Sequence, residues 1–108
     1  MALTYKVLGQ LSPAANTNTD IYTAPSSTSA VVSTISVCNR GASTTYRIAV
    51  RPANTAIEDK HYLVYNSTIN QYDSVYLTLG ITLGATDVIT VYSLSNTVSF
   101  GVYGSEIS

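Results

Sequence analysis

β-Branched side chains dominate this sequence and constrain its fold more than any other feature. Thr, Val and Ile occupy 34 of the 108 positions, with 15, 11 and 8 copies respectively. A branched Cβ restricts the side chain in a helix but packs well on a pleated sheet, so such a chain favours β-structure. These residues fall in short runs separated by Gly, Pro, Asn and Ser, as turn-connected strands do. The sequence therefore predicts an all-β protein with no amphipathic helix.

Apolar alternation and turn residues together predict about eight short strands. The clearest alternation places Tyr46, Ile48 and Val50 on one face of a strand and Arg47 and Arg51 on the other. The expected strands cover residues 3–11, 20–24, 30–38, 45–51, 60–66, 73–79, 87–94 and 97–103. Because each strand offers one apolar face, we expect two packed sheets, that is, a single antiparallel β-sandwich with jelly-roll or immunoglobulin-like topology.

One domain is expected over residues 1–108, since a chain of this length has room for one modest core. Residues 1–18 are expected to form an N-terminal strand or an arm. Gly80 and Gly84 predict a corner between strands, and residues 53–59 an irregular connection or one helical turn.

The charge content excludes several classes of partner. Charged residues make up 10% of the chain, and five basic residues face six acidic ones for a net charge of −1. Binding to nucleic acid or to an anionic membrane surface needs a basic field, which this chain lacks. It also has no apolar run long enough to span a bilayer and no pattern typical of a signal peptide. We therefore expect synthesis in a reducing cytoplasm and no contact with nucleic acid or membrane.

Groups for catalysis or metal binding are scarce. His61 is the single histidine, and Asp59 two residues earlier offers it a carboxylate, but no nucleophile elbow accompanies them. A zinc site needs several His or Cys ligands, whereas the chain has one of each. Cys38 lies in a β-rich run and is expected to be a small buried apolar residue. The sequence predicts no cofactor, no metal and no enzymatic activity.

The aromatic content points to contact with a partner. The chain has nine Tyr, one Phe and no Trp, and Tyr is enriched at protein interfaces because its ring buries area while its hydroxyl stays hydrogen-bonded. Arg47 and Arg51 share a strand face from which their planar guanidinium groups could bind carboxylates of a partner. The alternatives are rings that cover the ends of the sandwich and a solvated arginine face. The candidate partner-binding residues are Arg47, Arg51, Tyr62, Tyr72 and Tyr76.

Five stretches give the chain a family resemblance. They are Asp20-Ile21-Tyr22-Thr23-Ala24-Pro25, the run from Ala30 to Asn39 with the later Tyr46-Arg47-Ile48-Ala49-Val50, and the segments 80–93 and 101–108. Together they resemble small virion proteins of tailed bacteriophages over nearly the whole chain. The resemblance implies a β-sandwich with a structural role in the virion, and it leaves open whether the protein sits on the head or the tail.

A capsid decoration, or cement, protein is the leading functional expectation. Such a protein bridges neighbouring major capsid proteins, and the threefold positions of a capsid favour a homo-trimer. Low charge supports this expectation, because strands without charged residues are protected when neighbouring subunits cover them. The alternatives are a tail, baseplate or fibre component that binds a receptor or carbohydrate, and an adhesive carbohydrate-binding module of a bacterium.

Overall fold

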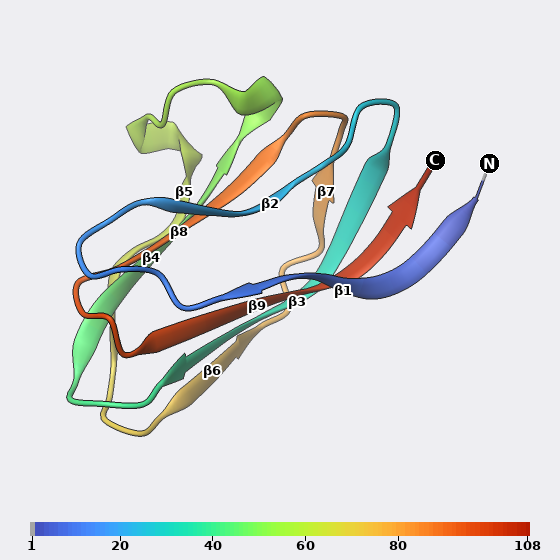
Figure 1. Cartoon of the computed structure of the whole chain (residues 1–108). Helices are drawn as coiled ribbons and strands as arrows, with labels where there is room; N and C mark the ends of the chain where they lie inside the picture. The colour runs from blue at the N-terminus through green and yellow to red at the C-terminus, as the bar shows by residue number, and fades with distance from the viewer. Residues whose placement is uncertain (1) are drawn as a thin grey trace.

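Two antiparallel β-sheets form the whole molecule (Figure 1). The structure, a computed structural model, describes residues 2–108. Sheet A contains β1 (Leu3–Leu11), β9 (Val98–Ile107), β3 (Ser29–Asn39), β6 (Ser74–Leu77) and β7 (Ile81–Leu83). Sheet B contains β2 (Thr19–Thr23), β8 (Val88–Ser93), β4 (Thr44–Arg51) and β5 (Tyr62–Ile69). The predicted antiparallel β-sandwich is confirmed.

The strand order is that of a jelly roll. Sheet A runs β1-β9-β3-β6, with β7 pairing the other half of β3, and sheet B runs β2-β8-β4-β5. When β6 and β7 are taken as one interrupted strand, each sheet has four strand positions, and the chain crosses between the sheets as in two Greek keys. Of the two topologies expected from the sequence, the structure has the jelly roll.

The core lies between the two sheets and consists mainly of β-branched residues. Sheet A contributes Val32, Ile35 and Val37 from β3, and sheet B contributes Ile48 from β4 and Val91 from β8, all at most 1% exposed. β8 is buried along its whole length, because it lies between β2 and β4 under outer-face side chains. The alternation predicted for residues 45–51 is confirmed, since Tyr46 and Ile48 point into this core.

Cys38 is exposed, so the expectation that it would be buried is wrong. The reason is a register shift between Val32 and Thr34, where β3 has one more residue than the paired stretch of β9. Val32 points inward, and after the shift the inward positions are Ile35 and Val37. Cys38 therefore falls on the outer side of sheet A.

Several predicted boundaries need correction. Residues 81–83, expected as part of a corner, form the short strand β7. Residues 59–61 form a 3-10 turn, so β5 begins at Tyr62 and runs to Ile69 rather than covering residues 60–66. β9 continues to Ile107, where residues 97–103 had been expected. Of the strand and the arm expected for residues 1–18, residues 3–11 form the strand, paired in sheet A, and residue 1 lies outside the described residues.

The three longest strands lie in sheet A, which extends beyond sheet B at one end. β1, β3 and β9 have 9, 11 and 10 residues, whereas β2 and β8 have 5 and 6. Figure 1 shows the first half of β1 and the last part of β9 reaching away together, and the backbones of Ala2 and Ser108 hydrogen-bond each other beyond them. Residues 3–7 of β1 are exposed throughout. Within the described residues, no helix is long and apolar enough to cross a membrane.

Candidate functional site

The outer face of sheet A is uncharged. Its five strands contain two charged residues, Lys6 and Glu106, and both point toward sheet B, where Glu106 contacts Tyr22 of β2. We call this surface the uncharged face. Its outward residues are Leu3, Tyr5 and Val7 of β1, Val31, Ser36 and Cys38 of β3, Tyr76 of β6, Thr82 of β7, and Ser99, Gly101, Tyr103 and Ser105 of β9.

Large apolar side chains stand out from this face into solvent. Tyr5 is 79% exposed, Tyr76 is 70% exposed, and Leu3 and Val7 are each 51% exposed. Scattered apolar residues are common on protein surfaces, but a face that combines several of them with no charge is typical of a contact surface. Arg40, which follows β3, borders the face and hydrogen-bonds Ser99 through its Nε.

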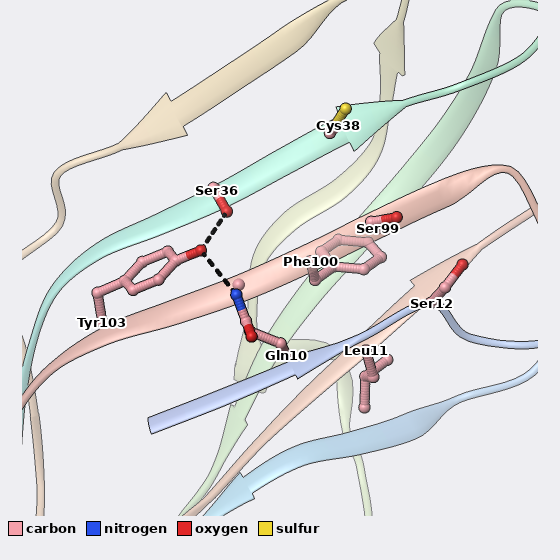
Figure 2. Close-up of a pocket in the computed structure, with 9 residues that line it drawn as sticks. Gln10, Leu11, Ser12, Ser36, Cys38, Ser99, Phe100 and Tyr103 are labelled. Atoms are coloured by element: carbon pink, nitrogen blue, oxygen red, sulfur yellow. Dashed lines mark hydrogen bonds between the residues drawn. The ribbon is translucent and has the colours of Figure 1, made fainter. Parts of the chain in front are cut away.

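A shallow hollow of about 330 Å³ lies on the uncharged face. Figure 2 shows that small side chains of β3 and β9 form part of its lining and that the Tyr103 ring lies along the sheet beside it. The Tyr103 hydroxyl oxygen accepts hydrogen bonds from Ser36 Oγ and Gln10 Nε2, each at 3.5 Å. Both bonds lower the pKa of Tyr103, and the bond from Ser36 is the larger cause.

Gly101 leaves the space that the Tyr103 ring occupies. A Cβ at position 101 would overlap the Tyr103 hydroxyl, and it would also approach Ser36 Oγ to 2.7 Å. A second hollow, of about 410 Å³, lies on the other side of Ser36 and is lined by Cys38, Tyr76 and Tyr103. The uncharged face is thus not flat, and it offers two recesses beside tyrosine rings.

The outer face of sheet B carries charge and has its own aromatic cluster. The Arg47 guanidinium carbon lies 4.4 Å from the ring centre of Tyr65 and 4.2 Å from that of Tyr92. Tyr62 meets Tyr65 edge-on with ring centres 4.8 Å apart. Such cation–π and aromatic contacts stabilise the face itself. We call Arg47, Tyr62, Tyr65 and Tyr92 the arginine–tyrosine cluster.

Arg51 is fully engaged within the chain. Its Nη2 forms an ion pair with Asp20 Oδ1 at 2.8 Å, its Nε donates to Thr90 Oγ1, and its Nη1 donates to the carbonyl of Thr55. The Thr90 hydroxyl in turn donates to Asp20. This network links β2, β8 and β4 on the outer face of sheet B, so the guanidinium already has partners for all three nitrogens.

The structure separates the candidate partner-binding residues that the sequence grouped together. Arg47, Arg51 and Tyr62 lie on the outer face of sheet B, whereas Tyr76 lies on the uncharged face. Tyr72 lies in the turn between β5 and β6 and is 75% exposed. The three candidate tyrosines therefore do not form one patch.

A group that sequence reasoning missed joins both sheets at the extended end. Glu106 of β9 forms an ion pair with Lys6 Nζ at 2.8 Å and accepts a hydrogen bond of 2.5 Å from the Tyr22 hydroxyl. The hydrogen bond from Lys6 is the largest cause of a lowered pKa of Glu106, and the bond from Tyr22 lowers it further. Burial, followed by the bond to Glu106, raises the pKa of Tyr22. Positions 6 and 106 are too far apart in sequence for any local pattern to reveal this contact.

His61 has a structural partner in its own turn. Its Nδ1 accepts a hydrogen bond of 3.0 Å from the backbone N–H of Glu58, and the side chain is 7% exposed. Asp59 points to a hollow of about 470 Å³ that it lines with Tyr62 and Tyr65. Within residues 2–108, no three His, Cys, Asp or Glu side chains gather in a way that could hold a metal ion.

Comparison with known proteins adds no relative: no family model, no curated protein and no solved structure matches this chain.

Proposed function

We propose that this protein is a structural component of a tailed-bacteriophage virion, where it decorates the capsid and holds neighbouring major capsid proteins together. The observation that carries the proposal is the uncharged face, which spans sheet A and bears the exposed side chains of Leu3, Tyr5, Val7 and Tyr76. The resemblance of the sequence to small phage virion proteins supports the same role.

The size of the molecule suits this role. Its two longer dimensions are 44 and 27 Å, so the broad side of the sandwich can cover the roughly 800 Å² per partner that a stable interface buries. A surface without charge avoids the cost of desolvating ions, which is large unless each ion is paired. Binding through the uncharged face therefore depends on tyrosine and aliphatic contacts, which dominate the energetics of interfaces.

Many copies of such a contact would reinforce a shell. Each copy that touches two capsid proteins adds its binding free energy to the junction between them, and that free energy must be lost before the junction opens. The capsid then resists heat and internal pressure better when decorated. The outer face of sheet B, with Asp20, Arg47 and Arg51, is left toward solvent.

Adding a charge to each outer face in turn tests the proposal. Thr82 on the uncharged face and Thr68 on the outer face of sheet B are both exposed strand threonines. Thr82→Lys is expected to weaken binding to capsids that lack the protein at least ~10-fold, because it buries an unpaired charge. Thr68→Lys should bind as the unmodified protein does. Co-sedimentation with such capsids measures both.

Two results would count against the cement role. Equal binding by the two lysine variants would mean that the uncharged face is not the contact surface. Immunogold labelling of intact particles that decorates the tail and not the head would reject the capsid location itself.

The second candidate is a tail or fibre component that binds carbohydrate. It is favoured by the hollow of about 470 Å³ between Asp59, Tyr62 and Tyr65, because aromatic rings beside a carboxylate suit a sugar's C–H faces and hydroxyl groups. This role predicts saccharide binding by the isolated protein that Tyr65→Ala abolishes and Tyr72→Ala leaves intact, as calorimetric titration would measure.

A further inference from the structure

The N-terminal half of β1 is a free edge exposed on both sides. β1 pairs with β9 along one side and ends the order of sheet A on the other. Residues 3–7 are all exposed, and β2 approaches β1 only further along, at Gly9, where a Cβ would overlap the carbonyl of Ile21. A row of backbone N–H and C=O groups therefore faces solvent beside Leu3, Tyr5 and Val7.

This edge lacks the usual protection against strand pairing. Natural edge strands are blocked by free charges, by Pro, by bulges or by being short. In residues 3–7 the one charge is Lys6, and its ammonium is held by Glu106 at 2.8 Å. The register shift in β1 lies after Val7, and Pro13 lies beyond the strand.

The other edges of the two sheets are protected in these ways. β6 and β7 have 4 and 3 residues and are separated by a break. β2 has 5 residues and a register shift, and β5 has two register shifts in its pairing with β4. The first half of β1 is thus the edge best suited to adding a strand.

We propose that residues 3–7 of β1 pair with the same residues of a second copy of this chain, antiparallel about a two-fold axis at Tyr5. The inference goes beyond the proposed virion role and does not depend on it.

The side-chain pattern of the segment is complementary to itself. A two-fold axis at Tyr5 places Tyr5 opposite its own copy, Leu3 opposite Val7, and Thr4 opposite Lys6. Apolar side chains then meet on one face, and the two lysines do not oppose each other, so no like charges are paired across the strands. An isologous dimer requires a surface that is complementary to itself. Residues 3–7 meet this requirement, so a second copy of the chain suffices as the partner.

The pairing also extends the uncharged face. Because the axis runs perpendicular to the sheet, the outer sides of both copies stay on the same side. The two copies of sheet A become one continuous sheet, and their recesses beside Tyr103 and Tyr76 lie on one surface. The trimer expected from capsid symmetry would instead need two different edges to meet.

Cysteine pairs test both the partner and the register. In a Cys38→Ser background, which removes the exposed native thiol, Tyr5→Cys is expected to form a disulfide-linked dimer under mild oxidation. Opposed residues in antiparallel strands have Cα atoms about 4.5–5.5 Å apart, within the range of about 4.4–6.8 Å that a disulfide spans. Leu3→Cys and Val7→Cys should each stay unlinked when alone, since like positions are about 13 Å apart along the strand. A mixture of these two variants should form the linked dimer.

Light scattering on the unmodified protein gives the independent measurement. The mass is expected to rise from 11.5 kDa to twice that value as concentration increases, and Tyr5→Lys should remain at the monomer mass. Thr82→Cys, on the uncharged face but in β7, is the control for random collision and should not link. Circular dichroism establishes that each variant is folded.

Three results would overturn the proposal. They are a monomer mass at all concentrations up to the millimolar range, a trimer mass, and linkage of Leu3→Cys alone as efficient as linkage of the mixture. Because all these measurements use the isolated protein, their failure leaves the capsid-binding experiment unaffected.

Discussion

Glu106 joins three strands through two hydrogen-bonded contacts. It binds Lys6 of β1 and Tyr22 of β2 from its position in β9, and its side chain is 15% exposed. A carboxylate that is held in this way keeps its proton less tightly in the folded chain than in the unfolded one, so its pKa is lowered on folding. The contact therefore makes the stability of the extended end of sheet A dependent on pH.

The direction of that dependence follows from the lowered pKa. The contribution of Glu106 to the free energy of unfolding is complete above its unfolded pKa of about 4.3 and is lost as the pH falls through its folded pKa. We expect Glu106→Gln to flatten the decline in the free energy of unfolding between about pH 5 and pH 3. Urea denaturation across that range measures it.

Asp59→Asn is the control for this pH series. It removes an exposed carboxylate that forms no ion pair or side-chain hydrogen bond among the described residues. Its decline toward acid pH should stay close to that of the unmodified protein. Equal flattening by both substitutions would show that the Glu106 contact is not the cause.

Asn39 is the buried polar residue with the most partners. Its Nδ2 donates to the carbonyls of Ala42, Ile69 and Asn70, and its Oδ1 accepts from the N–H of Gly41 and the hydroxyl of Thr97. The amide is 1% exposed, so it ties the end of β3 to β5 and to the turn before β9.

Truncating Asn39 removes all these hydrogen bonds, and it leaves the buried carbonyl of Ile69 without the bond from Nδ2. Asn39→Ala is expected to lower the free energy of unfolding by roughly 2–4 kcal/mol. Asn18→Ala, in an exposed loop, should change it by less than about 0.5 kcal/mol. Chemical denaturation of both variants compares them, and an equal effect would mean that the Asn39 network adds nothing to stability.

At the scale of elements, β1 and β2 close one side of the sandwich where they approach at Gly9. The approach depends on the missing side chain, since a Cβ would overlap the Ile21 carbonyl, and backbone cannot yield as a flexible side chain can. Gly9→Ala is expected to lower the melting temperature, with a cost of roughly 1–3 kcal/mol. Gly84→Ala is the control, because the nearest atom to its added Cβ is Asp87 Oδ2 at 3.6 Å. Calorimetry showing no difference between them would contradict this account.

How far the sequence predicts an element depends on whether its pattern is local. The alternation over residues 45–51 predicts β4 almost to the residue, because one buried face imposes a period of two. The alternation over residues 3–11 predicts the bounds of β1 but not its orientation, since Leu3, Tyr5 and Val7 face solvent. Cys38 was misplaced because the register shift in β3 adds a residue that composition does not reveal. β7 was missed because three residues between glycines are too few to show alternation.

The candidate site depends even more on contacts between distant residues. Arg51 and Asp20 are 31 positions apart, and Lys6 and Glu106 are 100 apart. No sequence spacing indicates that Arg51 is already paired, or that Tyr62 and Tyr76 belong to different sheets. The sequence shows that the chain has few charged residues. Only the topology shows that these residues leave the outer face of sheet A uncharged.

At the scale of the whole molecule, the jelly roll places the last strand at the centre of sheet A. β9 lies between β1 and β3, with Leu3 opposite Ile107, so the sheet is complete only when residues far apart in sequence have met. Such non-local pairing is typical of domains that fold in milliseconds to seconds. It also divides the strands into central ones and edges, and these two groups should open with different free energies.

Hydrogen exchange can measure that division and the proposed pairing at once. In dilute protein, amides of β8 and β3 are expected to exchange slowest, because these strands are paired on both sides and β8 is wholly buried. Amides of residues 3–7 should exchange faster. As the concentration rises, a β1–β1 pair would protect those amides of residues 3–7 that point away from β9, whereas a peptide covering β6 (Ser74–Leu77), at the other edge of the same sheet, should not change. Slowing of both peptides together would indicate general association, and slowing of neither would leave β1 as an unpaired edge.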